Sequence, residues 1–156
     1  GSGKSTVGVV LAMLLGLHFC DTDLVLQQHC GKKLQEIIRT EGDAAFFRHE
    51  EEELAALDVQ NTVIATGGSA VYSDRAMQHL KAGGKCVYLK VAADEIERRL
   101  ANFSDRGVVI ADGMTLADLY AARKPLYEKY ADITVSADGG TVWDTARRIA
   151  EALRVR

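Results

Sequence analysis

Short apolar runs alternate along the chain with stretches in which apolar residues recur every three or four positions. The short runs are rich in β-branched residues, which predicts buried strands. The periodic stretches predict helices with one apolar face. Because near-continuous apolar strands alternate with helices, we expect an α/β protein with a parallel sheet that helices cover on both faces.

The same pattern predicts where each element begins and ends. Strands are expected at 18–21, 62–66, 86–91 and 133–136. Helices are expected at about 5–16, 23–29, 33–40, 43–57, 73–82 and 94–100, with a final helix from residue 142. Thr115 and Asp118 have the spacing of a capping box, which predicts a helix start. Pro125, the only proline, is expected in the first turn of a helix, where it would fix the position of Arg123.

Length, charge and cysteine content exclude several classes of protein. The chain of 156 residues is the length of one domain. Lys and Arg total 19 against 22 Asp and Glu, a net charge of −3, which argues against a nucleic-acid-binding protein. The apolar stretch at 7–20 is too short to span a membrane, so we expect no membrane association. Three widely spaced cysteines without a C-x-x-C pattern are typical of a reduced compartment, and we expect a cytoplasmic protein.

The first six residues, G-S-G-K-S-T, match the end of a phosphate-binding loop that leads into a helix. Glycines let backbone N–H groups surround a phosphate, and the helix directs its positive end toward it. Lys4 can reach the β- and γ-phosphates, and the Ser5 hydroxyl can bind Mg²⁺. The first glycine of the motif and the strand before it would precede Gly1, so we expect that the natural N-terminus and the first strand lie upstream. The alternative is a flexible glycine-rich terminus.

Two groups of charged residues are candidate functional residues: one follows the strand predicted at 18–21, and the other lies in the helix predicted at 43–57. Asp21 and Asp23 come directly after a strand, where both carboxylates can face one cleft or can cap the next helix, and the motif alone does not decide between these. Glu51 lies on the predicted apolar face of the helix at 43–57 and needs a partner, for which Arg48 is well placed. Glu50 and the acidic residues at 52–53 are expected on a solvated face.

A pair of glycines and one arginine mark two further positions. Gly67 and Gly68 follow the strand at 62–66, where open α/β sheets bind ligands, although an ordinary tight turn has the same sequence. Arg106 lies in a polar, glycine-containing stretch at 103–114 that suits a lid, although a lone arginine there is more often a surface residue.

Together these residues resemble those of the shikimate kinases, small P-loop kinases of the nucleoside-monophosphate-kinase type. The similar segments cover nearly the whole chain in order: G-S-G-K-S-T, F-C-D-T-D, F-R-H-E-E, V-I-A-T-G-G, R-K-P-L-Y and A-D-I-T-V. The resemblance implies a three-layer α/β/α P-loop NTPase fold with a five-stranded parallel sheet. It also implies a single domain over 1–156, a shikimate-binding region at about 22–58 and a lid at about 102–116.

The resemblance further implies that the protein uses ATP and Mg²⁺ to phosphorylate the 3-hydroxyl of shikimate. The residues implied for ATP are Gly1, Ser2, Gly3, Lys4, Ser5, Thr6, Arg99 and Arg106. Those implied for shikimate are Asp23, Arg48, Gly67, Gly68 and Arg123. Ser5 would hold Mg²⁺ directly and Asp21 through water, and the catalytic residues would be Lys4, Asp23 and Arg106. We expect a monomer whose partners are these two small molecules.

Three positions depart from the pattern of the family. The third glycine after T-G-G is Ser69, the lid reads R-G-V-V at 106–109 without its proline, and the loop at 138–141 lacks its arginine and proline. These differences bear on affinity and specificity more than on the type of reaction. Two alternatives remain: a kinase of the same fold for another small hydroxylated carboxylic acid, and a nucleotide-binding regulatory module without catalysis.

Overall fold

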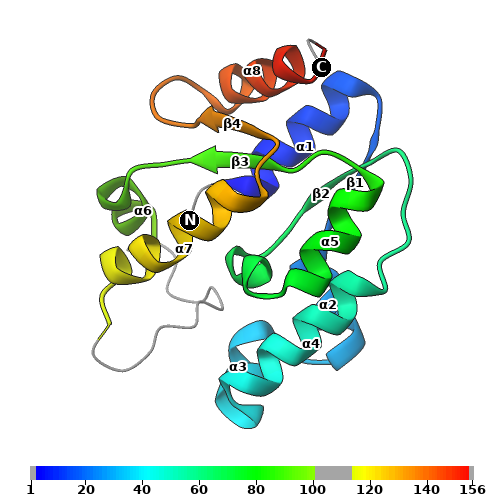
Figure 1. Ribbon diagram of the computed structural model, residues 1–156, viewed down its shortest axis with the longest axis vertical. Coiled ribbons are helices and arrows are strands. Elements are labelled where there is room, and N and C mark those ends of the chain that lie inside the picture. The colour runs from blue at the N-terminus through cyan, green and yellow to red at the C-terminus, as the bar shows by residue number, and fades with distance from the viewer. Residues whose placement is uncertain (1–2, 101–113, 155–156) are drawn as a thin grey trace.

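The computed structural model describes residues 3–100 and 114–154 (Figure 1). Its first half contains α1 (Lys4–Leu15), β1 (His18–Asp21), α2 (Thr22–Cys30), α3 (Leu34–Glu41), α4 (Asp43–Ala55), β2 (Thr62–Ala65) and the 3₁₀ helix η1 (Gly68–Tyr72). Its second half contains α5 (Asp74–Gly83), β3 (Val87–Lys90), α6 (Ala93–Leu100), α7 (Leu116–Tyr130), β4 (Ile133–Ser136) and α8 (Val142–Arg154). The chain is therefore an α/β protein, as the sequence predicts.

The strands form two parallel pairs rather than one continuous sheet within the described residues. β1 pairs with β2 so that Asp21 lies opposite Ala65, and β3 pairs with β4 so that Lys90 lies opposite Ser136. The parallel direction is confirmed, whereas the expected count of five strands is not. Because β1 and β2 are parallel, their carboxyl ends lie side by side. Asp21 and Asp23 at the end of β1 are therefore near Gly67 and Gly68, which follow β2.

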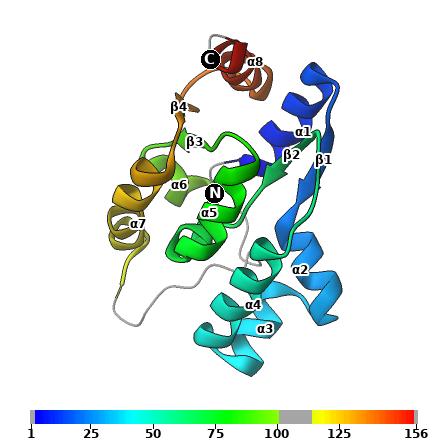
Figure 2. The same ribbon diagram turned by 45° about the vertical axis from the view of Figure 1, so that its right-hand side comes forward.

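The largest apolar cluster lies between α1, β4 and α8, and Figures 1 and 2 both show these elements at one end of the molecule. Val7, Val10 and Leu11 of α1 meet Ile133 of β4 and Ile149 of α8, all of them buried. Gly8 faces the Phe19 ring, which leaves no room for a side chain: a Cβ there would lie 2.7 Å from Cε1. This packing holds α1, and with it the phosphate loop, against the strands.

A second cluster joins α4, η1, α5 and α7. Its buried members are Leu54 of α4, Ala70 and Val71 of η1, Ala76 and Met77 of α5, and Tyr130 of α7. It fixes η1, which the sequence did not predict as a helix, against the middle of α7. The residues that follow β2 are therefore held next to Arg123.

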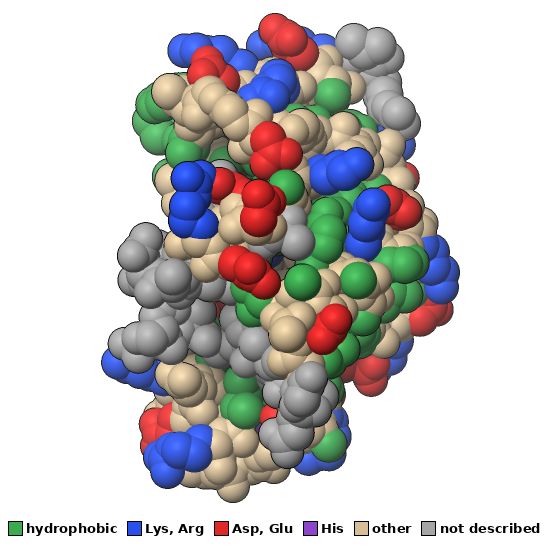
Figure 3. Space-filling view, turned by 90° about the vertical axis from the view of Figure 1, so that its left-hand side faces the viewer, with side chains coloured by type: hydrophobic (Ala, Val, Ile, Leu, Met, Phe, Trp, Pro, Cys, Tyr) green, Lys and Arg blue, Asp and Glu red, His purple; other side chains and the backbone are tan. Residues whose placement is uncertain are grey.

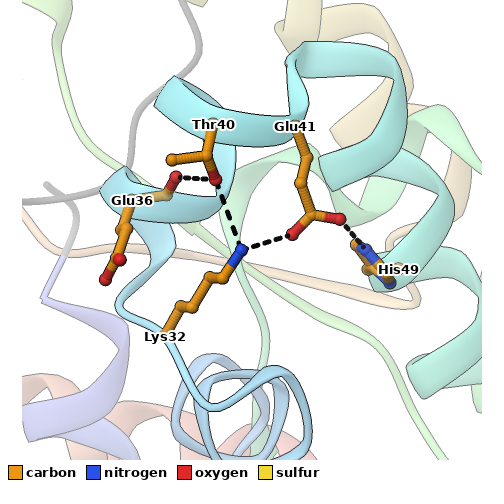
Figure 4. A network of polar contacts seen from close by, with 5 residues as sticks. All are labelled: Lys32, Glu36, Thr40, Glu41 and His49. Carbon is orange, nitrogen blue, oxygen red and sulfur yellow. Dashed lines mark hydrogen bonds and ion pairs between the residues drawn. The ribbon is translucent and has the colours of Figure 1, made fainter.

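Helices α2, α3 and α4 form a separate corner of the molecule around a third cluster (Figures 1 and 2). Polar contacts join α3 to α4 on its surface (Figure 4). Glu41 accepts from Lys32 Nζ at 3.5 Å and faces His49 Nε2 at 3.0 Å, while the Thr40 hydroxyl donates to the Glu36 carbonyl at 2.7 Å. The His49 contact, reinforced by Lys32, lowers the pKa of Glu41.

Asp132 joins α5 to the second pair of strands. Its carboxylate accepts from Lys81 Nζ at 3.0 Å and from the backbone N–H of Cys86 at 2.8 Å. The backbone N–H is the main cause of the lowered pKa of Asp132, and the Lys81 ammonium adds to it.

The helix starts are predicted well, with one exception. Thr115 and Asp118 form the expected capping box, with backbone-to-side-chain bonds of 3.0 and 3.1 Å. The expectation for Pro125 is wrong, because this residue lies inside α7 rather than in a first turn. Since Pro125 is exposed, the backbone group that it leaves unpaired can bond to water.

Basic and acidic side chains are interspersed on the face shown in Figure 3, in line with the small net charge. Among the helices of the described residues, none combines the length and apolar character that a membrane span needs.

Candidate active site

The end of the phosphate loop is built by the transition from Gly3 into α1. Gly3 has φ 81°, a left-handed conformation that glycine adopts without strain. The helix begins at once with Lys4, so its first N–H groups and its positive end face the loop. The Ser5 hydroxyl donates to Asp21 Oδ2 at 2.6 Å, which links the loop to the end of β1.

Asp21 both caps α2 and faces the phosphate loop, the two roles between which its sequence motif did not decide. Its Oδ1 accepts from the backbone N–H groups of Asp23 and Leu24, at 3.0 and 3.4 Å, and so caps α2. Its Oδ2 faces the loop through Ser5. A hydroxyl and a carboxylate this close together suit Mg²⁺, which binds oxygen and takes few ligands from protein when phosphates and water supply the rest. Within the described residues no set of three or more His, Cys, Asp or Glu side chains could hold a metal ion.

Asp23 reaches the glycines that follow β2. A Cβ placed on Gly67 would lie 2.9 Å from Asp23 Oδ1 and 2.8 Å from Glu50 Oε2. The absence of a side chain at Gly67 therefore lets two carboxyl groups approach the same stretch of backbone. The sequence predicted the position of Asp23 and missed that of Glu50.

Glu50 is buried, with 6% of its surface exposed, and the expectation of a solvated face is wrong for this residue. Its Oε1 accepts from the Ser69 hydroxyl at 2.6 Å, and its Oε2 is buried without a hydrogen-bond partner among the described residues. Burial raises the pKa of Glu50 to about 7, against the lowering effect of the Ser69 hydrogen bond. Asp23 raises it further, while Arg123 and Lys4 lower it. Ser69, Asp23, Arg123 and Lys4 therefore all lie around the Glu50 carboxyl group.

Glu51 and Arg48 do not form the pair that their spacing predicted. Glu51 accepts a short hydrogen bond from the Ser73 hydroxyl and lies 3.8 Å from Arg75 Nη1. Arg48 is exposed, and no hydrogen bond or ion pair is recorded for it within the described residues. The partners of Glu51 come from the start of α5 instead, since Ser73 and Arg75 both lie within contact distance of its carboxylate.

Arg123 is a buried cation with aromatic rather than acidic partners. It is 9% exposed, its Nε donates to the Tyr72 hydroxyl at 3.2 Å, and its guanidinium carbon lies 5.3 Å from the centre of the Tyr72 ring. Within residues 3–100 and 114–154 it has no ion pair to a carboxylate within 4.0 Å. Arg123 Nη1 would lie 2.7 Å from a Cβ on Gly68, so its guanidinium faces the glycine backbone.

Tyr127 supports this arrangement from one turn further along α7. Its hydroxyl donates to the Gly68 carbonyl at 2.8 Å, which fixes the start of η1. Burial raises the pKa of Tyr127, and Arg123 partly opposes the rise. Tyr127 therefore stays protonated and donates. The R-K-P-L-Y segment contained this residue, but only the fold assigns it to Gly68.

The structure brings together Lys4, Ser5, Asp21, Asp23, Gly67, Gly68 and Arg123, as the sequence predicted, and adds Glu50, Ser69 and Tyr127. Thr6 is exposed on α1 beside them. Gly1, Ser2 and Arg106 lie outside the described residues, as does the side chain of Arg99.

A phosphate loop at the start of a helix, an acidic residue joined to its serine, and a second carboxylate beside a buried arginine are the parts of a small P-loop kinase. Comparison with known proteins makes this more specific. The family model described as shikimate kinase matches residues 1–154. The shikimate kinase of Chlorobium chlorochromatii is 37% identical over 169 aligned residues, covering 99% of this chain and 88% of that protein. That of Francisella tularensis subsp. novicida is 35% identical over 157 residues, covering 98% and 89%.

Solved structures agree with this result. The structure of the shikimate kinase from Acinetobacter baumannii in complex with shikimate matches with a TM-score of 0.91 and 30% identity, covering 99% of this chain and 88% of that one. The chain belongs to the shikimate kinase family and is a kinase. Members of this family use ATP and Mg²⁺.

Proposed function

We propose that this protein transfers the γ-phosphoryl group of ATP to the 3-hydroxyl of shikimate, giving shikimate 3-phosphate and ADP. The observation that carries this proposal is the buried Arg123, whose described partners are a phenol and an aromatic ring. A guanidinium withdrawn from water needs an anionic partner, and a planar carboxylate matches it with two parallel hydrogen bonds. Shikimate is a carboxylate that also carries the hydroxyl to be phosphorylated.

The acceptor part of the site follows from this orientation. With the substrate carboxylate on Arg123, the ring would lie along Gly67 and Gly68, where a side chain would exclude it. Asp23, at the opposite end of these glycines, would accept a hydrogen bond from the reacting hydroxyl and take its proton late in the transfer. Arg48, which is exposed on α4, would close over the carboxylate as a second cation.

The donor part of the site is the loop before α1. Lys4 and the N–H groups at the helix start would hold the β- and γ-phosphates and stabilise the charge that develops there. Ser5 and, through water, Asp21 would hold Mg²⁺, which neutralises phosphate charge when it is bound with ATP. Gly1, Ser2, Gly3 and Thr6 complete the proposed loop, and Arg99 and Arg106 the proposed adenine and lid contacts.

The arrangement of the chain around this site is also part of the proposal. We assign a single kinase domain over 1–156, with a shikimate-binding region at about 22–58 and a lid at about 102–116. A fifth parallel strand between β2 and β3 would join the two pairs into one sheet. We further propose that the protein acts as a monomer, which sedimentation equilibrium tests.

Ser69 favours one alternative, a hydroxylated carboxylic acid other than shikimate. Its hydroxyl adds bulk and polarity beside the two glycines and is 7% exposed. Arg123 would bind the carboxylate of either substrate. A comparison of kcat/KM for shikimate and for other cyclic hydroxy acids separates these two proposals.

The test of the proposed function is the rate of ADP formation with and without shikimate. We expect shikimate-dependent turnover in the wild type and none in Lys4→Ala, because Lys4 acts on phosphate charge and not in the core. Lys85→Ala is the matched control, since Lys85 is an exposed lysine ahead of β3. ADP formation that does not respond to shikimate in the wild type, or normal kcat in folded Lys4→Ala, would contradict the assignment.

A further inference from the structure

The proposed reaction gives no role to Glu50, a buried carboxyl group of the site. It is anchored on one side only: Oε1 accepts from Ser69 Oγ at 2.6 Å, while Oε2 is buried without a hydrogen-bond partner in the described part of the chain. Oε2 lies against Gly67, on the same side as Asp23 Oδ1. A cavity of about 240 Å³ adjoins Glu50 and Ser69, between α4 and η1. An unpartnered buried oxygen is costly as a carboxylate and far less so as a neutral acid.

The charges that act on Glu50 come from three other helices. Asp23 projects from α2 and disfavours ionisation, while Lys4 from α1 and Arg123 from α7 favour it. Tyr127 of α7 also faces this group and stays protonated. Of the other charged residues on the packed elements, Arg75 of α5 faces Glu51, Glu41 of α3 faces His49 and His29 of α2 faces Glu53, while Arg48 and Glu52 of α4 are exposed.

Binding of a carboxylate substrate shifts the ionisation equilibrium of Glu50 toward the protonated form. Arg123 now favours the ionised form of Glu50, and a substrate carboxylate paired with Arg123 cancels that effect. The substrate also displaces water and adds a negative charge to a site that already holds Asp23. Each of these changes favours the protonated form of Glu50.

We propose that Glu50, anchored by Ser69, is a further positioning residue of the acceptor site, and that it must carry a proton for the anionic substrate to bind. This inference rests on the proposed function, because it takes shikimate as the carboxylate that occupies Arg123. The neutral acid leaves the substrate carboxylate to Arg123 and keeps a second negative charge away from Asp23. Above neutral pH, binding of the substrate takes up the proton.

The expected size of the effect follows from the titration of the free protein. With a pKa of about 7, Glu50 is about nine-tenths ionised at pH 8 and about one-tenth ionised at pH 6. If the bound form stays protonated, the Kd for shikimate rises about tenfold between pH 6 and pH 8, and binding at pH 8 takes up about nine-tenths of a proton.

Calorimetric titration of shikimate into the full chain measures both quantities. Titrations at pH 6 and pH 8, in pairs of buffers with different protonation enthalpies, give the Kd and the number of protons taken up. Glu50→Gln mimics the protonated acid, so we expect it to match the wild type at pH 6. At pH 8 it should bind about tenfold more tightly than the wild type, without Glu50-dependent proton uptake.

Two further variants separate this role from a structural one. Ser69→Ala removes the hydrogen bond that lowers the pKa of Glu50, so the rise in Kd should begin at a higher pH. Glu52→Gln makes the same chemical change at an exposed position of α4 and should follow the wild type at both pH values. If Glu50 only supported the fold, its replacement would weaken the binding of shikimate equally at pH 6 and pH 8.

The outcomes distinguish the inference from the proposed function. No binding of shikimate by the wild type at pH 6 would overturn both. Binding at pH 6 with the same proton uptake in the wild type and Glu50→Gln would overturn only the role of Glu50. If Glu50→Gln does not fold, an unshifted pH dependence in Ser69→Ala would overturn it instead.

Discussion

Replacement of Arg123 tests the feature on which the substrate assignment depends. In Arg123→Ala the site loses its buried cation, and of the two arginines proposed for the carboxylate of shikimate only the exposed Arg48 would remain. Removal of one partner of a buried, hydrogen-bonded charge pair costs roughly 2–5 kcal/mol. That range corresponds to about a 30-fold to 5,000-fold increase in the Kd for shikimate.

Arg123→Lys refines this estimate, because lysine keeps the charge and loses the fork of two parallel donors. It also loses the Nε bond to the Tyr72 hydroxyl, which is 3.2 Å long, and the planar contact with the Tyr72 ring. Loss of one charged hydrogen bond costs about 1.5–3 kcal/mol. We therefore expect Arg123→Lys to bind shikimate roughly 10-fold to 150-fold more weakly than the wild type.

The assay is calorimetric titration of each variant with shikimate and, separately, with ATP, with circular dichroism to verify folding. Arg147→Ala is the matched control, because Arg147 on α8 is exposed and its described contacts, Asp144 at 3.9 Å and the Trp143 ring, belong to its own helix. The Kd for ATP should stay within about twofold of wild type in all three variants. A folded Arg123→Ala with unchanged affinity for shikimate would refute the placement of the carboxylate on Arg123.

Two further predictions concern close packing and pH. Gly67→Ala would bring a Cβ within 2.9 Å of oxygens of both Asp23 and Glu50. We therefore expect the free energy of unfolding to fall by about 1–3 kcal/mol, with a lower kcat. Gly83 lies in open space, so the control Gly83→Ala should leave thermal unfolding and kcat unchanged or slightly improved. Equal kcat in the two alanine variants would contradict this packing. The lowered pKa of Asp132 stabilises the fold above the pKa of an unfolded aspartate, and this contribution is lost as pH falls through the folded pKa. Asp132→Asn should therefore lower Tm at pH 7 but not at pH 2, and an equal difference from wild type at both values would refute the linkage.

Local sequence determined much of the fold and the donor half of the site. The runs at 18–21 and 133–136 became β1 and β4 with the predicted bounds. The second run, I-T-V-S, is rich in β-branched residues and the first, H-F-C-D, contains an aromatic one, and both kinds of residue favour strands. The capping box at Thr115 formed because its two hydrogen bonds lie within one turn of the same chain. The phosphate loop is local in the same sense, since its glycines and the helix start are consecutive residues.

Residues of α4 show where local reasoning ends. The sequence placed Glu51 on the buried face and Glu50 on the solvated one, whereas the buried stripe of α4 runs through Phe46, Glu50 and Leu54. A helical period gives the spacing of a face, but the neighbouring elements decide which faces are covered. Phe46 packs in the cluster with α2 and α3, and Leu54 in the cluster with η1 and α5, so the stripe that joins them through Glu50 is the buried one.

The acceptor half of the site was therefore decided by tertiary structure. Ser69 meets Glu50 across 19 positions of the chain, and Tyr127 meets Gly68 across 59. No local propensity specifies such contacts, since they depend on how β2, η1 and α7 are packed against one another. The sequence supplied a phosphate loop, two aspartates and an arginine; only the fold placed a buried glutamate beside them and left the arginine without a carboxylate partner in the described residues.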